Sequence, residues 1–323
     1  MDLFKSRINR RTFGGLTVGA AASASFASLV SAQDATPEAE DTVDTAVGEV
    51  SSLAELEDVT QVEVTAHENS YALFLGDENQ PGWYVFNVEN TTESPAAFNL
   101  VRLPEGTEIG DFTSFLFQLT SGEVSEIPEW LQDATFAGGG YTPAGETGST
   151  LVNLDAGEWV VFSDLAASTQ NVTTFLVLEP EADEEAGATP EVGESTAIMA
   201  PEGFGSTFTV SIEDGAISAD SSPRVGYNII GVRNDASNAA NFILLHSDEE
   251  VDEAAASDLA SSWLAGEDAG AHVDTGMGVI SPDAYGYVEL EAEAGTYVGF
   301  SSSVNESGGT QLEDGAVIVF NVG

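Results

Sequence analysis

The chain has 323 residues, of which 55 are acidic, seven are Lys or Arg and none is Cys. This length is enough for two domains of ordinary size, each with its own hydrophobic core. The lack of Cys excludes disulfides and thiolate metal ligands, and the net charge of −48 argues against nucleic acid or an anionic membrane as a partner.

The first 32 residues are typical of an export signal. Paired arginines, Arg10 and Arg11, precede a weakly apolar stretch that reaches Val30, and small residues allow cleavage after Ala32. The pair resembles twin-arginine signals, which serve chains that fold before export, and an ordinary secretory signal is the alternative. The stretch is too weakly apolar for a stable membrane anchor. We therefore expect a mature protein outside the cytoplasm, without a membrane span.

Removal of the signal makes the charge more extreme. The remaining 54 acidic residues face only Arg102, Arg224 and Arg233, which gives a net charge of −51 without a single Lys. Such a chain repels itself at low ionic strength, and salt screens that repulsion. The composition resembles that of proteins from salt-loving organisms, so we predict that folding depends on high salt. A merely acidic secreted protein is the alternative.

Two acidic segments that contain proline divide the rest of the chain. Their low apolar content and high charge predict unfolded linkers over residues 33–58 and 181–198. The division leaves two candidate domains, residues 59–180 and 199–323.

The two candidate domains match each other in sequence, which indicates a tandem duplication. Residues 82–103 align with residues 226–246, and residues 138–163 align without a gap with residues 276–301. We call the two copies the first and the second repeat.

Most segments of each repeat alternate apolar and polar residues, which predicts β-strands. One segment of each repeat, 106–122 and 247–266, has helical spacing instead. In the second repeat, Ser247 and Glu250 form a candidate capping box and Gly266 a helix stop. The apolar face of that helix would consist of Val251, Ala255, Leu259 and Trp263. The sequence therefore predicts an all-β fold of two sandwiches, each with one short helical crossover.

A short motif occurs in both repeats. From Gly138 to Gly157, and again from Gly276 to Tyr297, a glycine-rich turn precedes an alternating strand and a strand that begins with Ala-Gly. These residues resemble cupredoxin-like domains of the plastocyanin and azurin type, and more closely the metal-free members found in secreted bacterial and archaeal proteins. The resemblance implies two tandem Greek-key β-sandwiches whose last two strands flank the loop that holds the metal in blue-copper proteins.

The corresponding loops of this chain lack the blue-copper ligands. Blue copper requires a Cys thiolate and two imidazoles, whereas the segments 162–171 and 300–309 contain no Cys, His or Met. A blue-copper site is therefore excluded, and we interpret Ser301–Ser303 as part of a polar turn.

A different metal site is one hypothesis for the second repeat. His246 ends an apolar strand near the place where cupredoxins keep their first imidazole, and Arg102 stands there in the first repeat; His272 and Met277 follow, five residues apart. His246, His272 and Met277, completed by a carboxylate, would bind copper or zinc. The alternative is that these histidines and His67 are unrelated residues of loops and strand ends.

Catalytic residues are not indicated. Acidic residues are too frequent for any pair to mark acid–base chemistry, and no nucleophile elbow with the pattern GxSxG occurs. We therefore predict an exported protein that is not an enzyme and needs no cofactor, with a binding or structural role at the cell surface or in the medium. Its partner would be an unknown cell-surface protein or glycan. Structural calcium, for example at residues 76–79, stays open. The alternative function is metal binding or redox chemistry in the second repeat.

Overall fold

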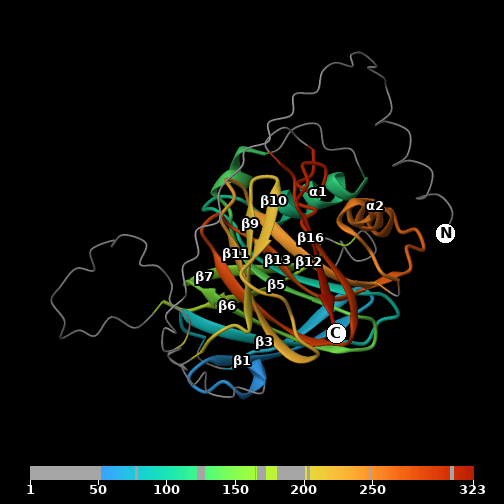
Figure 1. Cartoon of the computed structure of the whole chain (residues 1–323). Coiled ribbons are helices and arrows are strands. Elements are labelled where there is room, and N and C mark those ends of the chain that lie inside the picture. The colour runs from blue at the N-terminus through green and yellow to red at the C-terminus, as the bar shows by residue number, and fades with distance from the viewer. Residues whose placement is uncertain are drawn as a thin grey trace, which may run out of the picture. The chain divides into compact units, whose positions relative to one another are not determined.

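The computed structural model describes residues 52–323, except 77–78, 122–127, 164, 166–171, 180–200, 202–203, 248 and 306–308. The predicted signal peptide, the predicted linker at 181–198 and most of the predicted linker at 33–58 lie outside the described residues. In the described part, β-strands dominate, and one α-helix interrupts the strands of each repeat (Figure 1). The prediction of an all-β fold with one helical crossover per repeat is confirmed.

The first repeat contains eight of the described strands and the helix α1 (Ile109–Ser121), which connects β4 to β5. The strands are β1 (Thr60–His67), β2 (Ser70–Phe74), β3 (Gly82–Asn90), β4 (Ala96–Arg102), β5 (Thr135–Thr142), β6 (Thr147–Leu154), β7 (Gly157–Phe162) and β8 (Thr173–Val177). Short 3-10 helices, η2 (Leu53–Glu55) and η3 (Glu129–Asp133), precede β1 and β5.

The second repeat has the same order of elements, with α2 (Glu253–Leu264) between β12 and β13. Its strands are β9 (Phe208–Glu213), β10 (Ala216–Ala219), β11 (Gly226–Asn234), β12 (Ala240–Ser247), β13 (Ala271–Ile280), β14 (Tyr285–Ala292), β15 (Gly295–Phe300) and β16 (Val317–Val322). The structural correspondence supports the tandem duplication, because β3 matches β11, and β7 matches β15, residue for residue in the sequence alignment.

Both repeats contribute to each of two eight-stranded sheets. The first sheet has the order β10-β9-β11-β14-β6-β3-β1-β2, and the second has the order β16-β15-β12-β13-β5-β4-β7-β8. Corresponding strands occupy mirrored places in each list, so the repeats meet along the antiparallel pairs β6–β14 and β5–β13. The two repeats therefore form continuous sheets instead of sandwiches joined only by a linker.

A single core runs between the sheets through both repeats. Buried side chains of both repeats belong to one cluster, among them Phe98 and Val152 of the first and Phe242 and Met277 of the second. A Cβ at Gly138 would lie 2.6 Å from the sulfur of Met277, so glycine at this position lets β5 and β13 approach closely.

The segment before β1 also packs on both repeats. Leu53 is fully buried, and its cluster includes Val85 of β3 and Tyr287 of β14. The backbone amide of Leu53 and the hydroxyl of Ser52 both donate hydrogen bonds to the carboxylate of Glu289 in β14. The described end of the segment predicted as linker is thus attached to the first sheet.

Helix α2 begins later than the sequence predicts. Ser247 is the last residue of β12, where it pairs with Ala271 and Thr296, so it does not cap the helix. Asp252 is the N-cap instead, and its carboxylate accepts a hydrogen bond from the amide of Ala255. The capping box predicted from Ser247 and Glu250 is therefore wrong.

The buried face of α2 also differs from the prediction. The fully buried helix residues are Ala256 and Ala260, whereas Ala255 is exposed. Leu259 and Trp263 do pack against the second sheet. The smaller Ala side chains let the helix lie close to the strands. Among the described residues, no helix is long and apolar enough to span a membrane.

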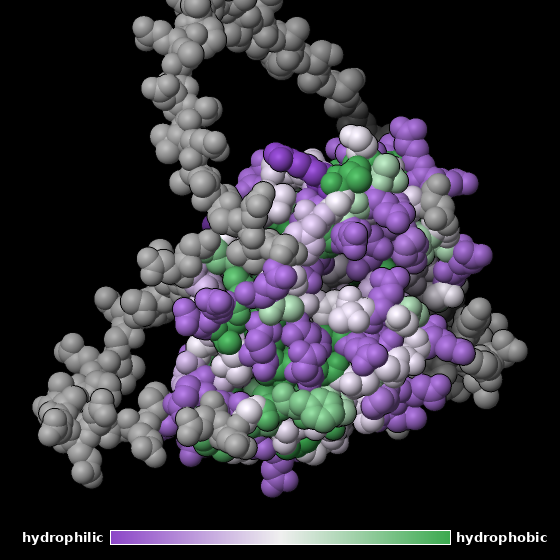
Figure 2. All heavy atoms as spheres, turned by 90° about the horizontal axis from the view of Figure 1, so that it is seen from below, coloured by the Kyte–Doolittle hydropathy of each residue, from purple (hydrophilic) through white to green (hydrophobic). Residues whose placement is uncertain are grey.

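Figure 2 shows one face of the molecule, where hydrophilic residues predominate and apolar side chains occupy smaller areas between them. This pattern agrees with the acidic composition.

Candidate metal site

The candidate site lies where three neighbouring strands of the second sheet run side by side. His246, near the end of β12, pairs directly with His272 of β13 on one side and with Tyr297 of β15 on the other. Side chains that are directly opposite on adjacent antiparallel strands have Cβ atoms only about 5 Å apart. The ladder itself therefore brings the two imidazoles together.

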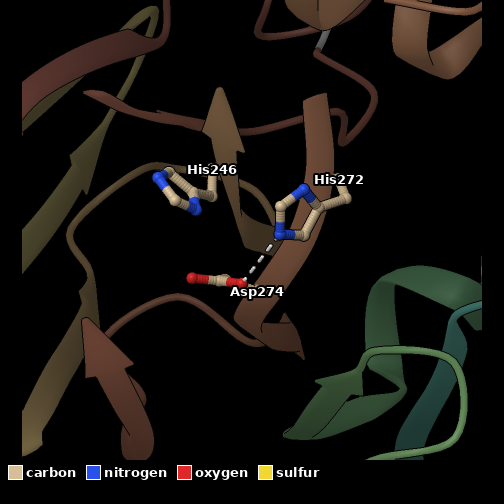
Figure 3. Close-up of side chains that lie close together, drawn as sticks. All are labelled: His246, His272 and Asp274. Carbon is tan, nitrogen blue, oxygen red and sulfur yellow. Dashed lines mark ion pairs between the residues drawn. The ribbon is translucent and has the colours of Figure 1, made fainter. Parts of the chain in front are cut away.

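A β-bulge adds a carboxylate to this pair. The register between β12 and β13 shifts between Leu244 and Leu245, and Asp274 is the extra residue on β13. Bulges commonly redirect side chains. In Figure 3, the carboxylate of Asp274 and the rings of His246 and His272 face a common space.

The potential ligand atoms lie close to one another. One potential ligand atom from each of His246, His272 and Asp274 lies within 4.8 Å of the other two. The separation between His272 Nε2 and Asp274 Oδ1 is 3.4 Å, which is about the separation of two ligand atoms on a tetrahedral ion with bonds of about 2.0–2.2 Å. The two His ring centroids are 5.3 Å apart.

The site is exposed to solvent at His272, whereas the ring of Tyr297 covers one face of His246. The side chain of His272 is 57% exposed and that of Asp274 is 19% exposed, while His246 is half-buried. Burial raises the pKa of Asp274 above its ordinary value; the nearby His272 and His246 and a hydrogen bond with Tyr297 act in the opposite direction. A bound cation would offset the cost of burying this carboxylate.

Tyr297 supports the site from below. Its ring stacks on that of His246, with centroids 4.6 Å apart and planes 7° apart. Its hydroxyl accepts a hydrogen bond of 2.9 Å from the amide of Glu293 and interacts with Asp274. Burial raises the pKa of Tyr297 to about 12, so the phenol stays protonated at neutral pH. Tyr297 thus contacts both the ring of His246 and the carboxylate of Asp274.

The structure brings together two of the three predicted ligands. Met277 is fully buried and belongs to the core. It pairs with Phe242, four residues along β12 from His246, which is about 13 Å on an extended strand. Met277 therefore does not join the group. Asp274 supplies the carboxylate that the hypothesis left unnamed. The sequence carried no signal for it, because acidic residues are frequent throughout the chain.

The loop after β15 lies at the other end of β12. The side-chain oxygen of Asn241 accepts hydrogen bonds from Ser301 Oγ, Ser302 N and Ser303 Oγ, at 2.9–3.2 Å. The resemblance implied that His246 lies near this loop. His246 is instead five residues further along β12 than Asn241, which is about 17 Å on an extended strand. The described serines form a hydrogen-bonded turn, and the residues there do not fit a blue-copper ion, which requires a thiolate.

The third histidine is elsewhere. His67 is the last residue of β1 in the first repeat, it is exposed, and its Nδ1 lies 3.2 Å from the hydroxyl of Thr91. Residues 77–78 of the calcium candidate at 76–79 lie outside the described residues.

No protein-family model and no curated protein matches this chain. Several solved structures are similar to it. An auracyanin from Roseiflexus castenholzii aligns with 36% of this chain and 94% of its own, at 14% identity and a TM-score of 0.25. Auracyanin A from Chloroflexus aurantiacus, a blue copper protein, aligns with 37% of this chain and 98% of its own, at 10% identity and a TM-score of 0.26.

A copper-containing nitrite reductase from Thermus scotoductus aligns with 82% of this chain and 61% of its own, at 9% identity and a TM-score of 0.21. These similar proteins are of the cupredoxin type that the sequence resembles. At such identities the likeness concerns the arrangement of strands alone. The proposals below rest on the residues of this chain.

Proposed function

We propose that this chain is an exported, non-catalytic protein that binds one transition-metal ion through His246, His272 and Asp274. The observation that carries the proposal is the approach of two imidazoles and one carboxylate to within 4.8 Å of one another. The three side chains come from adjacent strands, β12 and β13, whose pairing holds them in place. A position for a ligand from solvent remains on the exposed side of His272.

The ligand set selects the class of metal. Imidazole suits zinc, copper, nickel and iron, and a carboxylate is an ordinary partner in such sites. Two His and one carboxylate also hold ferrous iron in non-haem proteins. Calcium and magnesium prefer oxygen ligands, so they should not compete at this site. Zinc and copper(II) are the ions proposed here.

Export and an extracellular partner are part of the same proposal. Arg10 and Arg11, the apolar stretch that follows and the small residues before Ala32 support export by the twin-arginine route. The net charge supports a salt-rich setting outside the cell and a partner other than nucleic acid. A cell-surface protein or glycan remains the proposed class of partner.

Isothermal titration calorimetry tests the metal site. Zinc and copper(II), and ferrous iron without oxygen, are titrated into the mature protein in about 1 M NaCl, where the Debye length is about 3 Å. Excess calcium occupies the unspecific acidic sites. We expect one metal ion to bind tightly per chain. His272→Ala should lower the affinity at least about 100-fold, because losing a residue that binds the metal should cost more than the 10–100-fold lost when a residue that only orients the ligands is replaced.

His67→Ala is the matched control, because it removes an exposed imidazole that lies in the first repeat. It should bind metal as the wild type does. Equal affinity in His272→Ala and the wild type would refute the proposed site.

A further inference from the structure

The first repeat carries a fixed cation at the place where the second repeat carries the candidate metal site. Arg102 of β4 aligns with His246 of β12, and Trp159 of β7 aligns with Tyr297 of β15. The pairing is equivalent as well, since Arg102 lies directly opposite Trp159 and His246 directly opposite Tyr297. The two ends of the sandwich are thus built alike.

In the first repeat, the guanidinium group of Arg102 links neighbouring groups at this end of the sandwich. The Arg102 guanidinium carbon lies 5.7 Å from the ring centre of Trp159, which is within the range of a cation–π interaction. Its Nη1 donates a hydrogen bond of 2.9 Å to the carbonyl of Ala156, and its Nη2 lies 3.6 Å from Asp155 Oδ2. The group therefore interacts with an aromatic face, a carbonyl and a carboxylate.

The second repeat keeps this setting but has His246 at the position of Arg102. Asp155 and Ala156 align with Glu293 and Ala294. In both repeats the aromatic side chain forms a hydrogen bond with the main chain four residues earlier. Trp159 Nε1 donates to the carbonyl of Asp155, and the hydroxyl of Tyr297 accepts from the amide of Glu293.

A glycine also lies beneath each side chain. A Cβ on Gly157 would lie 2.8 Å from Cδ of Arg102, and a Cβ on Gly295 would contact the imidazole of His246. Both repeats therefore keep the same space open under the residue that faces the aromatic ring.

We propose that the imidazole of His246, when it holds the metal ion, takes the structural place of the Arg102 guanidinium, so that metal binding stabilises this end of the sandwich. The inference rests on the proposed function, and it adds that the ion acts as an exchangeable counterpart of a permanent cation. The first repeat always has a positive charge at this place, because Arg remains charged at any physiological pH. The second repeat has one only when metal is bound, so its stability depends on the metal concentration.

His246→Arg tests this inference directly. The new side chain would meet Tyr297, the carbonyl of Ala294 and the carboxylate of Glu293, as Arg102 meets their counterparts. We expect the metal-free variant to melt at the temperature of the metal-loaded wild type, without any response to metal. At about 100 times its dissociation constant, metal should lower the unfolding equilibrium constant of the wild type about 100-fold.

Two matched variants complete the experiment. His246→Ala should lose the metal response and melt no higher than the metal-free wild type. His67→Arg adds the same charge elsewhere and should keep both the metal response and the melting temperature of the metal-free wild type. Hydrogen exchange on the wild type gives a second readout, in which metal should protect residues 293–298 and 271–275.

The outcomes separate the two proposals. A rise in melting temperature follows from any binding to the folded state alone. A wild type that binds metal without protection of residues 293–298 would therefore overturn this inference and leave the proposed function standing. The same holds if His246→Arg melts no higher than His246→Ala. A wild type that binds no metal would overturn the proposed function, and this inference with it.

Discussion

At the scale of single residues, Asp274 is a largely buried carboxylate in the proposed metal site. Glu293 adds a second negative charge nearby. Without metal, the partners that favour its charged form are His272, His246 and the hydroxyl of Tyr297. They do not balance the effect of burial, which raises its pKa.

We predict that Asp274→Asn will not destabilise the metal-free protein. A raised pKa means that Asp274 contributes stability below its unfolded pKa of about 3.9 and loses it as pH rises through the folded value. At pH 7 the carboxylate is thus a net cost. Urea unfolding at pH 7 with a chelator should show an unchanged or higher free energy of unfolding in the variant. A loss of more than about 1 kcal/mol would contradict this account, as would unchanged metal affinity.

Asn241 shows a purely structural use of a polar residue beside the loop that corresponds to the metal-binding loop of blue-copper proteins. Its side-chain oxygen accepts hydrogen bonds from three serines. Its side-chain nitrogen donates hydrogen bonds to Tyr141 Oη at 3.0 Å and to Ser302 Oγ at 2.9 Å. Asn241 and Ser301 are buried, so water does not readily replace these bonds.

We predict that Asn241→Ala lowers the free energy of unfolding by about 2–3 kcal/mol, because buried partners lose their hydrogen bonds. Asn238→Ala is the control: its main-chain carbonyl, which binds Asn234, remains, and the loss should stay below about 0.5 kcal/mol. Chemical denaturation measures both. Equal stability of the two variants would show that the turn does not depend on Asn241.

At the scale of elements, the glycines of β5 let the two repeats join. Gly138 has a φ of +96°, and a Cβ there would lie 2.6 Å from Met277 Sδ and 2.8 Å from Ile280 Cγ2. Both a strained backbone and overpacking would follow from any side chain. The close contact between β5 and β13 therefore depends on this residue.

Gly138→Ala should lower the free energy of unfolding by about 3 kcal/mol, from the combined strain and overpacking. Gly110→Ala is a matched control in α1, because a Cβ there meets no atom within 4 Å; it should be neutral or stabilising by up to about 1 kcal/mol. Thermal and urea unfolding compare the two. A mild effect at Gly138 would mean that the junction tolerates a wider spacing.

The strands and helices were largely predictable, because the same element could be recognised at corresponding positions in both repeats. The limits of α2 were not, since Ser247 satisfies a capping pattern but is held in β12 by pairing with Thr296. The candidate site was predictable only in part. His246 and His272 stand out as rare residue types, whereas the role of Asp274 depends on a bulge, and acidic residues are too common in this chain to single out one.

At the scale of the whole molecule, the repeats share two sheets and a core, and the chain carries an extreme charge. Signal cleavage would leave a net charge of −51 on the mature protein. Continuous sheets hold like charges at fixed distances, so repulsion acts on the folded state as a unit.

We predict that the melting temperature rises with NaCl between about 0.1 M and 1 M, over which the Debye length falls from about 10 Å to about 3 Å. Calorimetry should show one cooperative transition at high salt, because both repeats contribute to one core. KCl should act as NaCl does if screening is the cause. A melting temperature that does not rise with salt would refute the salt-dependent folding proposed for this chain.

Anomalous diffraction would show whether a metal ion binds between His246, His272 and Asp274, as we propose. Crystals grown with zinc at high salt are measured on both sides of the zinc absorption edge. We expect one strong peak at about 2.0–2.2 Å from an imidazole nitrogen of each histidine and from a carboxylate oxygen of Asp274. Zinc found only on surface carboxylates elsewhere, with no peak between these three side chains, would contradict this proposal.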